Sequence, residues 1–403
     1  MTLSVEWYVA DHLFLTKLNS LHSMPHNSRI SNSDFWREKL FGYLDKMLSS
    51  ANYTPTQHSK HLEFFSQWVI PLLGSKPRYI KGKYVPTFKS YMCDDHTPVE
   101  FSLAWKSDNS KPMVRLSIEP LPTDDQADQS QIVQYGLFVL DNLQQTFQYP
   151  MSAFANYFVM DASLFFNILK TIGFSNDQKG PAIISNIFLG FDLLPFQAQL
   201  KAYCVLSNSL DIVEKRALVS KIISAYAQDT AASAILAYFQ SKSADWRSTY
   251  SPDPIIIGVD CTGTSDARIK IYIRYKVTDF DQIVDQFTLG GRVPVSLACI
   301  AALRDLWCRF VGKDSDPFLR SSDTSGILFY YEFNTLKSLP SVKVYMPVRL
   351  MGKNDQAIVE TTADWLGNHT QFSKYRDAFV NVVSEIWQGD CFSLGRITLL
   401  MTF

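Results

Sequence analysis

A short pattern that occurs three times constrains the fold of this chain more than any other feature of its sequence. A basic residue, one apolar residue and a tyrosine stand inside an apolar, strand-like run, as Lys201-Ala202-Tyr203, Lys270-Ile271-Tyr272 and Lys343-Val344-Tyr345. Residues i and i+2 of a strand point to the same face, so each copy places an ammonium group beside a phenol ring. Three such strands predict one surface on which cations and aromatic faces alternate.

The surroundings of the three copies match, which makes the pattern an internal repeat. Each copy forms the second strand of a predicted hairpin, and the first strands span residues 187–193, 254–261 and 326–333. Short polar or proline-containing turns separate the partners. An earlier hairpin joins residues 98–105 to 113–120 and carries Arg115 at the basic position, but Ser117 in place of the tyrosine. A weaker strand, 396–403, carries neither residue.

Amphipathic helical stretches alternate with these hairpins, at residues 33–50, 58–73, 130–147, 211–228, 293–311 and 371–388. This order is typical of an α+β fold with antiparallel strands. About ten strands in consecutive hairpins avoid exposed edges by closing into a barrel. The sequence therefore predicts a closed ten-stranded antiparallel β-barrel with a solvent-accessible lumen, surrounded by a ring of α-helices. The Lys-x-Tyr face would point into the lumen, and Ile269, Ile271, Val342 and Val344 would point toward the helices.

The predicted surface suits a ligand with a polyanionic end and an end that becomes positive. Cations hold phosphate groups, and tyrosine faces stabilise a carbocation through the ring quadrupole. An allylic diphosphate that ionises is such a ligand. A single copy of the pattern would more simply be an amphipathic strand with Lys and Tyr facing water, but three matching copies favour a binding surface.

With these hairpins and this repeated pattern, the chain resembles a known family, the fungal aromatic prenyltransferases of the dimethylallyltryptophan synthase type. The family fold is a ten-stranded antiparallel barrel inside a ring of helices, also called the PT barrel or ABBA fold. Seven segments in family order carry the resemblance: 52–74, 97–105, 114–121, 191–203, 267–275, 287–292 and 339–355. The resemblance covers nearly the whole chain.

The resemblance implies a role for each matching residue. The diphosphate-binding set would be Arg115, Lys201, Arg268, Lys270 and Lys343, and the tyrosines that shield the allylic cation would be Tyr203, Tyr272 and Tyr345. Glu100 would accept a hydrogen bond from the indole N–H of the acceptor. The implied activity is transfer of a dimethylallyl group from dimethylallyl diphosphate to an indole, in tryptophan or a tryptophan-containing cyclic dipeptide, in alkaloid secondary metabolism. No metal or other cofactor would be required, because several cations neutralise the leaving diphosphate.

The C-terminal strand departs from the family pattern. Relatives end in a strand with tyrosines and a basic residue, whereas this chain offers Met401 and Phe403. The last wall of the pocket would therefore be less polar, and the length of the prenyl group and the ring position attacked stay open. A phenolic or polyketide acceptor is the alternative to an indole.

A literal DDxxD motif, at Asp124, Asp125 and Asp128, indicates a different class of enzyme, a magnesium-dependent terpene synthase. The motif lies in a polar segment after Pro122, without an apolar helical context or a second acidic cluster. A solvated loop before a helix, where acidic residues are favoured, explains it more simply. A catalytically silent isoprenoid-binding protein is a third, less favoured hypothesis.

Composition limits the remaining classes of protein. The chain has 403 residues and no linker or low-complexity block, so we expect a single domain over residues 1–403, as a monomer or a homodimer. Its net charge of −1 gives no electrostatic support for nucleic-acid binding. The longest uncharged apolar run, 293–303, is well below the ~20 residues of a membrane helix. With no signal-peptide pattern, the expected location is the cytoplasm.

Overall fold

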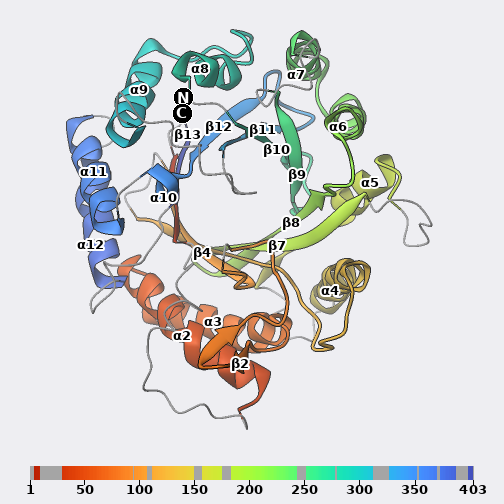
Figure 1. The fold of residues 1–403 in the computed structure, drawn as a ribbon, viewed down its shortest axis with the longest axis vertical. Coiled ribbons are helices and arrows are strands. Elements are labelled where there is room, and N and C mark those ends of the chain that lie inside the picture. Colours follow the sequence, from red (N-terminus) through yellow and green to blue (C-terminus); the bar gives the residue numbers. More distant parts are fainter. Residues whose placement is uncertain are drawn as a thin grey trace.

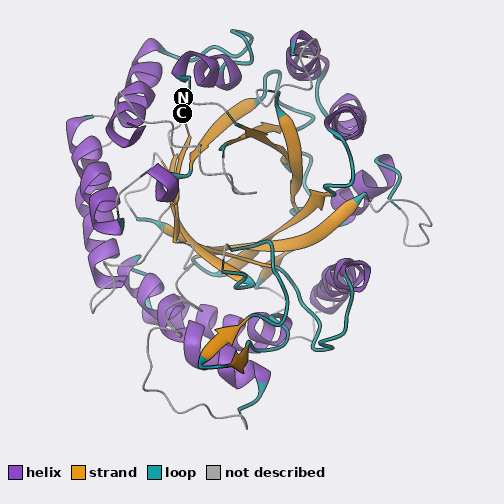
Figure 2. Ribbon diagram, in the orientation of Figure 1, coloured by secondary structure: helices purple, strands orange, loops and turns teal. Residues whose placement is uncertain are grey.

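A large curled sheet lies at the centre of the molecule, and helices surround it (Figures 1 and 2). The computed structural model describes residues 4–9, 30–93, 95–106, 111–148, 157–174, 183–242, 251–276, 279–311, 326–351, 354–369, 373–386 and 398–402. The N-terminal strand and the C-terminal strand lie next to each other in the sheet.

The strands of the large sheet are β1 (Ser4–Val9), β4 (Val99–Lys106), β5 (Met113–Ile118), β6 (Phe158–Val159), β7 (Ile184–Leu194), β8 (Gln197–Leu206), β9 (Asp253–Asp260), β10 (Ile269–Tyr275), β11 (Ile327–Phe333), β12 (Ser341–Met346) and β13 (Thr398–Thr402). Their order is β6-β8-β7-β5-β4-β1-β13-β12-β11-β10-β9, and β8 also pairs with β9. All pairings are antiparallel except the one between β6 and β8. The four predicted hairpins and the C-terminal strand are present.

The α+β class is confirmed, and ten antiparallel strands are present as predicted, but the large sheet contains one further strand. The sheet has eleven strands, because β6 adds in parallel to β8 at Ala198 and Gln199. The pairing with β9 covers only Lys201–Val205 of β8, so β6 provides partners for backbone groups of β8 that β9 leaves uncovered. The N-terminal strand β1, absent from the predicted set, joins β4 to β13.

The helices outside the sheet are α2 (Asn32–Ser50), α3 (Pro55–Phe64), α4 (Gln129–Gln148), α5 (Ser163–Thr171), α6 (Ile212–Tyr226), α7 (Asp229–Ser241), α8 (Phe280–Phe287), α9 (Leu297–Val311), α10 (Val348–Met351), α11 (Asp355–Asn368) and α12 (Arg376–Ile386). Local sequence signals determine where several of these helices begin. A capping box formed by Thr54 and Gln57 starts α3, and another formed by Asp211 and Glu214 starts α6. These caps satisfy backbone N–H groups that a helix leaves without partners.

The two faces of the strands carry different side chains. Ile269, Ile271, Val342 and Val344 are buried in the main hydrophobic core, which also contains helix residues such as Ile283 of α8. Their orientation toward the helices is as predicted. The opposite, inner face carries the lysines and tyrosines of the repeated pattern, and its tyrosines form a separate cluster. The alternation along each strand therefore separates a structural face from a chemically equipped face.

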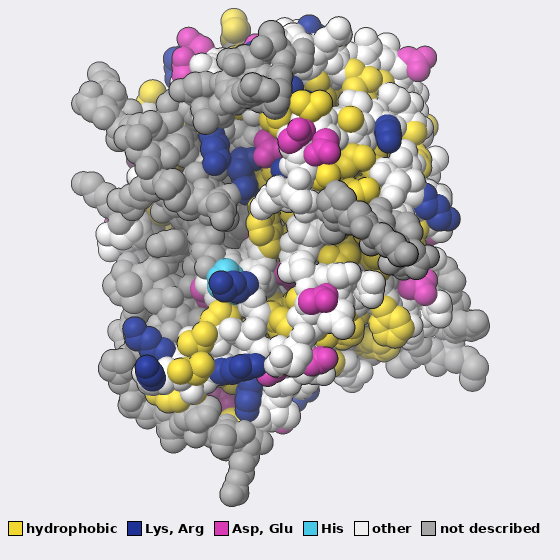
Figure 3. Space-filling view, turned by 45° about the vertical axis from the view of Figure 1, so that its right-hand side comes forward, with side chains coloured by type: hydrophobic (Ala, Val, Ile, Leu, Met, Phe, Trp, Pro, Cys, Tyr) yellow, Lys and Arg dark blue, Asp and Glu magenta, His cyan; other side chains and the backbone are white. Residues whose placement is uncertain are grey.

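A small hairpin, β2 (Arg78–Ile80) and β3 (Lys83–Val85), forms a sheet of its own. Acidic, basic and apolar side chains are interspersed on the face of the molecule drawn in Figure 3. Among the described helices, none combines the length and the apolar character needed to cross a membrane.

Candidate active site

Positive and negative side chains alternate across six neighbouring strands on the inner face of the sheet. In the register, Arg115 of β5 lies opposite Asp192 of β7, Lys201 of β8 opposite Asp260 of β9, and Lys270 of β10 opposite Glu332 of β11. We call these six residues the charge belt. Asp192, Lys201, Asp260, Lys270 and Glu332 are each at most 5% exposed. The fold therefore brings three predicted diphosphate-binding cations together in one buried row.

The carboxylates of the charge belt hold the cations in place. Lys201 Nζ donates to Asp192 Oδ1 at 2.5 Å, and Arg115 Nε lies 3.0 Å from the same oxygen. On the other side, Lys270 Nζ donates to Asp260 Oδ1 and Arg268 Nε to Asp260 Oδ2, each at 2.6 Å. Each aspartate thus pairs with two cations, and Arg268 also lies 3.4 Å from Glu332 Oε2.

Electrostatics within the belt follow from burial and from these pairs. Burial alone would raise the pKa of Asp260, but Lys270, Lys201 and Arg268 lower it, and the net result is a pKa well below the usual range. Burial likewise opposes ionisation of Glu332, yet the charges of Arg268 and Lys270 lower its pKa to about 2. Burial lowers the pKa of Lys201 to about 7, and the nearby Arg115 guanidinium adds to this effect. The belt therefore contains ionised carboxylates and one lysine that titrates near neutrality.

The three predicted tyrosines lie beside the belt in one aromatic cluster. The ring centroids of Tyr203 and Tyr272 are 6.1 Å apart, and those of Tyr272 and Tyr345 are 5.9 Å apart. The fourth member is Tyr330, whose ring centroid is 5.1 Å from that of Tyr272 and 5.7 Å from that of Tyr345. It lies outside the repeated Lys-x-Tyr pattern. Lys343 Nζ lies 5.2 Å from the Tyr330 centroid, in the range of a cation–π contact.

Glycine makes room for one of these rings. A Cβ atom at Gly258 of β9 would lie 2.6 Å from Tyr203 Cδ1, and one at Gly190 of β7 would lie 3.0 Å from Tyr203 Cε2. The close approach of the tyrosine ring therefore restricts position 258 to glycine and leaves little space for a side chain at position 190. The Tyr203 ring can occupy this position because the two neighbouring strands carry no side chain at Gly190 and Gly258.

Gly258→Ala should therefore displace the Tyr203 ring. If Tyr203 shields an allylic cation, as the resemblance implies, we expect about a tenfold lower rate of aromatic prenylation and a larger share of donor hydrolysed to the prenyl alcohol, because a displaced ring admits water to the cation. The measurement is the ratio of alcohol to prenylated product. Gly42→Ala is the matched control, since a Cβ at that position in α2 meets nothing within 4 Å. An unchanged ratio in a folded Gly258→Ala protein would contradict the shielding role.

Glu100 lies on the strand where it was predicted and in register with the belt. It stands in β4 opposite Ser117 of β5, which lies opposite Gly190 of β7, and Gly190 lies opposite Lys201. Directly paired residues point to the same face of a sheet. Glu100 is therefore on the same inner face as the cations and the tyrosines, two strands away from the position opposite Lys201.

A segment before β4 contacts the inner face farther along the strands. The ring of Tyr91 stacks on Phe188 of β7 with a centroid distance of 6.2 Å and an interplanar angle of 15°. Arg274 of β10 donates to the Tyr91 hydroxyl at 3.1 Å. The buried carboxylate of Glu119 accepts from the Tyr91 backbone N–H at 3.0 Å, and from Ser90 Oγ at 2.6 Å. These residues form a wall that no pattern in the sequence indicated.

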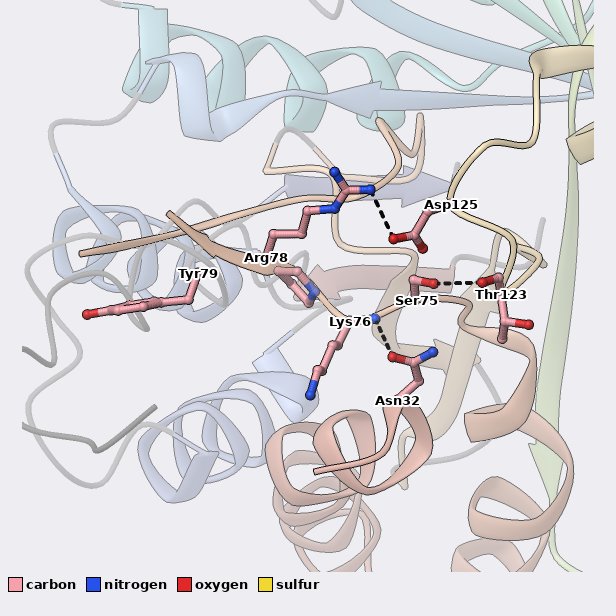
Figure 4. Close-up of a pocket in the computed structure, with 8 residues that line it drawn as sticks. Asn32, Ser75, Lys76, Arg78, Tyr79, Thr123 and Asp125 are labelled. Carbon is pink, nitrogen blue, oxygen red and sulfur yellow. Dashed lines mark hydrogen bonds and ion pairs between the residues drawn. The ribbon is translucent and has the colours of Figure 1, made fainter. Parts of the chain in front are cut away.

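The DDxxD motif lies elsewhere, and each of its aspartates has a local partner. Asp125 accepts from Arg78 at 2.9 Å beside a surface cavity of about 440 Å³ (Figure 4). Asp124 accepts from the Gln126 backbone N–H, and Asp128 from that of Gln131 near the start of α4. The residues lining the cavity, among them Asn32 and Lys76, lie outside the large sheet. The motif acts as a turn and a helix start in this fold.

The inner face of this mainly antiparallel sheet thus combines cations paired with carboxylates and a cluster of tyrosines, and helices surround the sheet. Comparison with known proteins identifies the family. A sequence profile of the family described as tryptophan dimethylallyltransferase matches residues 32–381. The chain belongs to this family. It is a prenyltransferase, and the family is described by the transfer of a dimethylallyl group to tryptophan.

Individual relatives agree with this membership. A 4-O-dimethylallyl-L-tyrosine synthase of Claviceps purpurea is 28% identical over 351 residues, which cover 82% of this chain and 75% of the relative. The crystal structure of AnaPT from Neosartorya fischeri matches with a TM-score of 0.67 at 18% identity and covers 96% of this chain and 97% of AnaPT. The crystal structure of NotF in complex with brevianamide F and DMSPP matches with a TM-score of 0.66 at 18% identity, covering 96% and 98%. The two structures show a shared fold.

Proposed function

We propose that this chain is a cytoplasmic enzyme that transfers a dimethylallyl group from dimethylallyl diphosphate to the indole of tryptophan or of a tryptophan-containing cyclic dipeptide. The reaction would take place within the curled sheet, in a lumen enclosed by ten antiparallel strands, and without a metal ion. The observation that carries the proposal is the register, which sets Lys201, Lys270 and the tyrosine cluster on one inner face. Membership in a family described as tryptophan dimethylallyltransferase also supports the proposal.

The donor would bind with its diphosphate on the cations and its prenyl group on the tyrosines. Arg115, Lys201, Arg268, Lys270 and Lys343 would hold the diphosphate oxygens. Two residues along a strand span about 6.6 Å, so the allylic carbon of a donor held at Lys270 would reach the level of Tyr272. The faces of Tyr203, Tyr272 and Tyr345 would then stabilise the cation and exclude water from it.

The chemical step would be an electrophilic aromatic substitution. The allylic C–O bond breaks and the diphosphate leaves with the electron pair, while fixed cations compensate the growing negative charge. The electron-rich ring attacks the allylic cation, and transfer of the proton at the attacked carbon to the released diphosphate or to water restores the aromatic ring. Glu100 would accept the indole N–H and stabilise the positive charge that develops on the ring during attack.

A phenolic acceptor is the second candidate, and one specific observation favours it: a relative that covers most of the chain is named as a synthase of 4-O-dimethylallyl-L-tyrosine. A carboxylate at position 100 could accept a hydrogen bond from a phenol as well as from an indole. Purified protein should therefore be incubated with dimethylallyl diphosphate and a panel containing L-tryptophan, cyclic dipeptides with tryptophan, L-tyrosine and simple phenols. Prenylation of indoles, read by mass spectrometry, would support the proposal, and prenylation of phenols alone would replace it by the alternative.

Removal of divalent metal ions should leave the activity in place. With the leaving diphosphate neutralised by side chains, we expect turnover to persist in excess EDTA. Changing Asp124, Asp125 and Asp128 together to Asn should cost less than about tenfold, because these residues bond to Arg78 and to backbone N–H groups outside the large sheet. The measurement is the initial rate with and without EDTA. Complete loss that added Mg²⁺ restores would instead favour the magnesium-dependent class.

A further inference from the structure

Asp192 occupies a position between two cations of the charge belt. Its Oδ1 atom accepts from Lys201 Nζ at 2.5 Å and lies 3.0 Å from Arg115 Nε. All three side chains are largely removed from water: the side chains of Asp192 and Lys201 are 6% exposed and that of Arg115 13%. One carboxylate between two cations leaves a net positive charge, so Asp192 does not cancel the attraction of this group for an anion.

Lys201 depends on this carboxylate because its other surroundings oppose its charge. Arg115 on β5 and Lys270 on β10 repel it, and burial removes its hydration. Asp260 on β9 lies opposite Lys201 in the register, but its two oxygens already accept from Lys270 and Arg268. Asp192 on β7 is therefore the direct ion-pair partner of Lys201 among these neighbours.

We propose that Asp192 is a positioning residue that keeps Lys201 charged and directed into the diphosphate site. This inference rests on the proposed function, which assigns Lys201 to the diphosphate. In the free protein the ammonium group bonds to Asp192, and an arriving diphosphate provides further acceptors for its remaining N–H groups. Without the carboxylate, Lys201 would lose its proton at a lower pH and would present a neutral amine to the ligand.

The direction of the pH effect follows from the charge of Lys201. The amine of the wild-type protein titrates near pH 7, so its charged form is dominant below that pH and declines above it. Binding of a diphosphate requires the charged form, and affinity should weaken as the pH rises. Loss of Asp192 removes a favourable interaction with the ammonium and shifts this decline to lower pH. At acidic pH the same substitution also removes a negative charge that competes with the ligand.

The test measures binding of inorganic diphosphate by calorimetry between about pH 6 and pH 8.5. For Asp192→Asn we expect a loss of affinity that grows with pH and reaches about tenfold or more at the alkaline end. The double variant Asp192→Asn with Lys201→Arg should recover most of this loss, because a guanidinium stays charged over the whole range. Comparing variants at the same pH cancels the titration of the diphosphate itself.

Asp253→Asn is the matched control. Asp253 also bonds to a buried lysine, Lys215 of α6, at 3.2 Å, but this pair joins a helix to β9 and lies outside the belt. We expect diphosphate binding unchanged at every pH. A loss in Asp192→Asn that is equal at all pH values, or one that Lys201→Arg does not relieve, would overturn the inference and assign Asp192 a purely structural role.

The inference remains testable even if one variant fails to fold. If Asp192→Asn does not fold, Lys201→Arg alone still tests the inference, since its affinity should decline less above pH 7 than that of the wild type. An identical decline would overturn it. The measurement needs neither an acceptor nor turnover. A protein with this pH signature but no prenyl transfer would refute the proposed function alone, whereas prenyl transfer without the signature would refute the inference alone.

Discussion

Lys270→Ala should lower the catalytic efficiency toward dimethylallyl diphosphate by about ten- to a thousandfold. Lys270 is 5% exposed and donates to Asp260 at 2.6 Å. A charge-assisted contact to the leaving group contributes roughly 1.5–3 kcal/mol, and more where water is excluded during ionisation. The measurement is the single-turnover rate per folded molecule. Lys270→Met, which retains most of the alkyl chain, should show a similar loss, because the charge and not the volume is responsible.

Stability must be separated from chemistry in this experiment. Breaking a buried ion pair from one side typically costs 3–5 kcal/mol of folding free energy, although Asp260 keeps its contact with Arg268. Lys215→Ala is the matched control, because Lys215 is also 5% exposed and bonds to an aspartate, yet it lies on α6. We expect a lower melting temperature for both variants but normal turnover only for Lys215→Ala. Wild-type rates in folded Lys270→Ala would contradict the diphosphate role.

The hairpins were predictable from sequence because each carries its own local signals. A strand pattern of period two, a turn and a second strand lie close together in the chain, as in β9 and β10. β1 has no such neighbour. It pairs with β4 and with β13, which lie about 90 and about 390 residues away, and six residues alone do not specify a strand. The short parallel strand β6 likewise depends on a distant element, because it pairs with backbone groups of β8 that β9 leaves uncovered.

The candidate site was predictable in its cations but not in its carboxylates. The repeated Lys-x-Tyr pattern is a same-face signal within one strand, whereas the ion pairs run between strands and depend on register. A signal was nevertheless present: the first strand of each repeated hairpin contains an acidic residue, Asp192, Asp260 or Glu332. The contact between Tyr91 and Arg274 joins segments 183 residues apart, and only the folded chain reveals it. The roles of these residues in catalysis stay predictions.

Glu100→Gln should lower the rate of the chemical step by about a hundredfold while acceptor binding weakens only slightly. Glutamine preserves the shape and one acceptor oxygen but removes the negative charge. That charge matters most when positive charge develops on the ring, so its loss affects the transition state more than the bound acceptor. The measurements are the single-turnover rate and the dissociation constant of the acceptor, with the melting temperature of the same sample.

A second carboxylate, Glu119, has a structural role and is the control for Glu100. Glu119 follows β5, is 1% exposed, and accepts from Ser90, from the Tyr91 backbone and from Asn186. Glu119→Gln should lower the melting temperature more than Glu100→Gln does, because it disturbs three buried hydrogen bonds, and it should change the single-turnover rate much less. If Glu100→Gln instead loses stability and retains its rate per folded molecule, Glu100 belongs with Glu119 as a residue that holds the first hairpin, and acceptor activation must come from another group on the inner face.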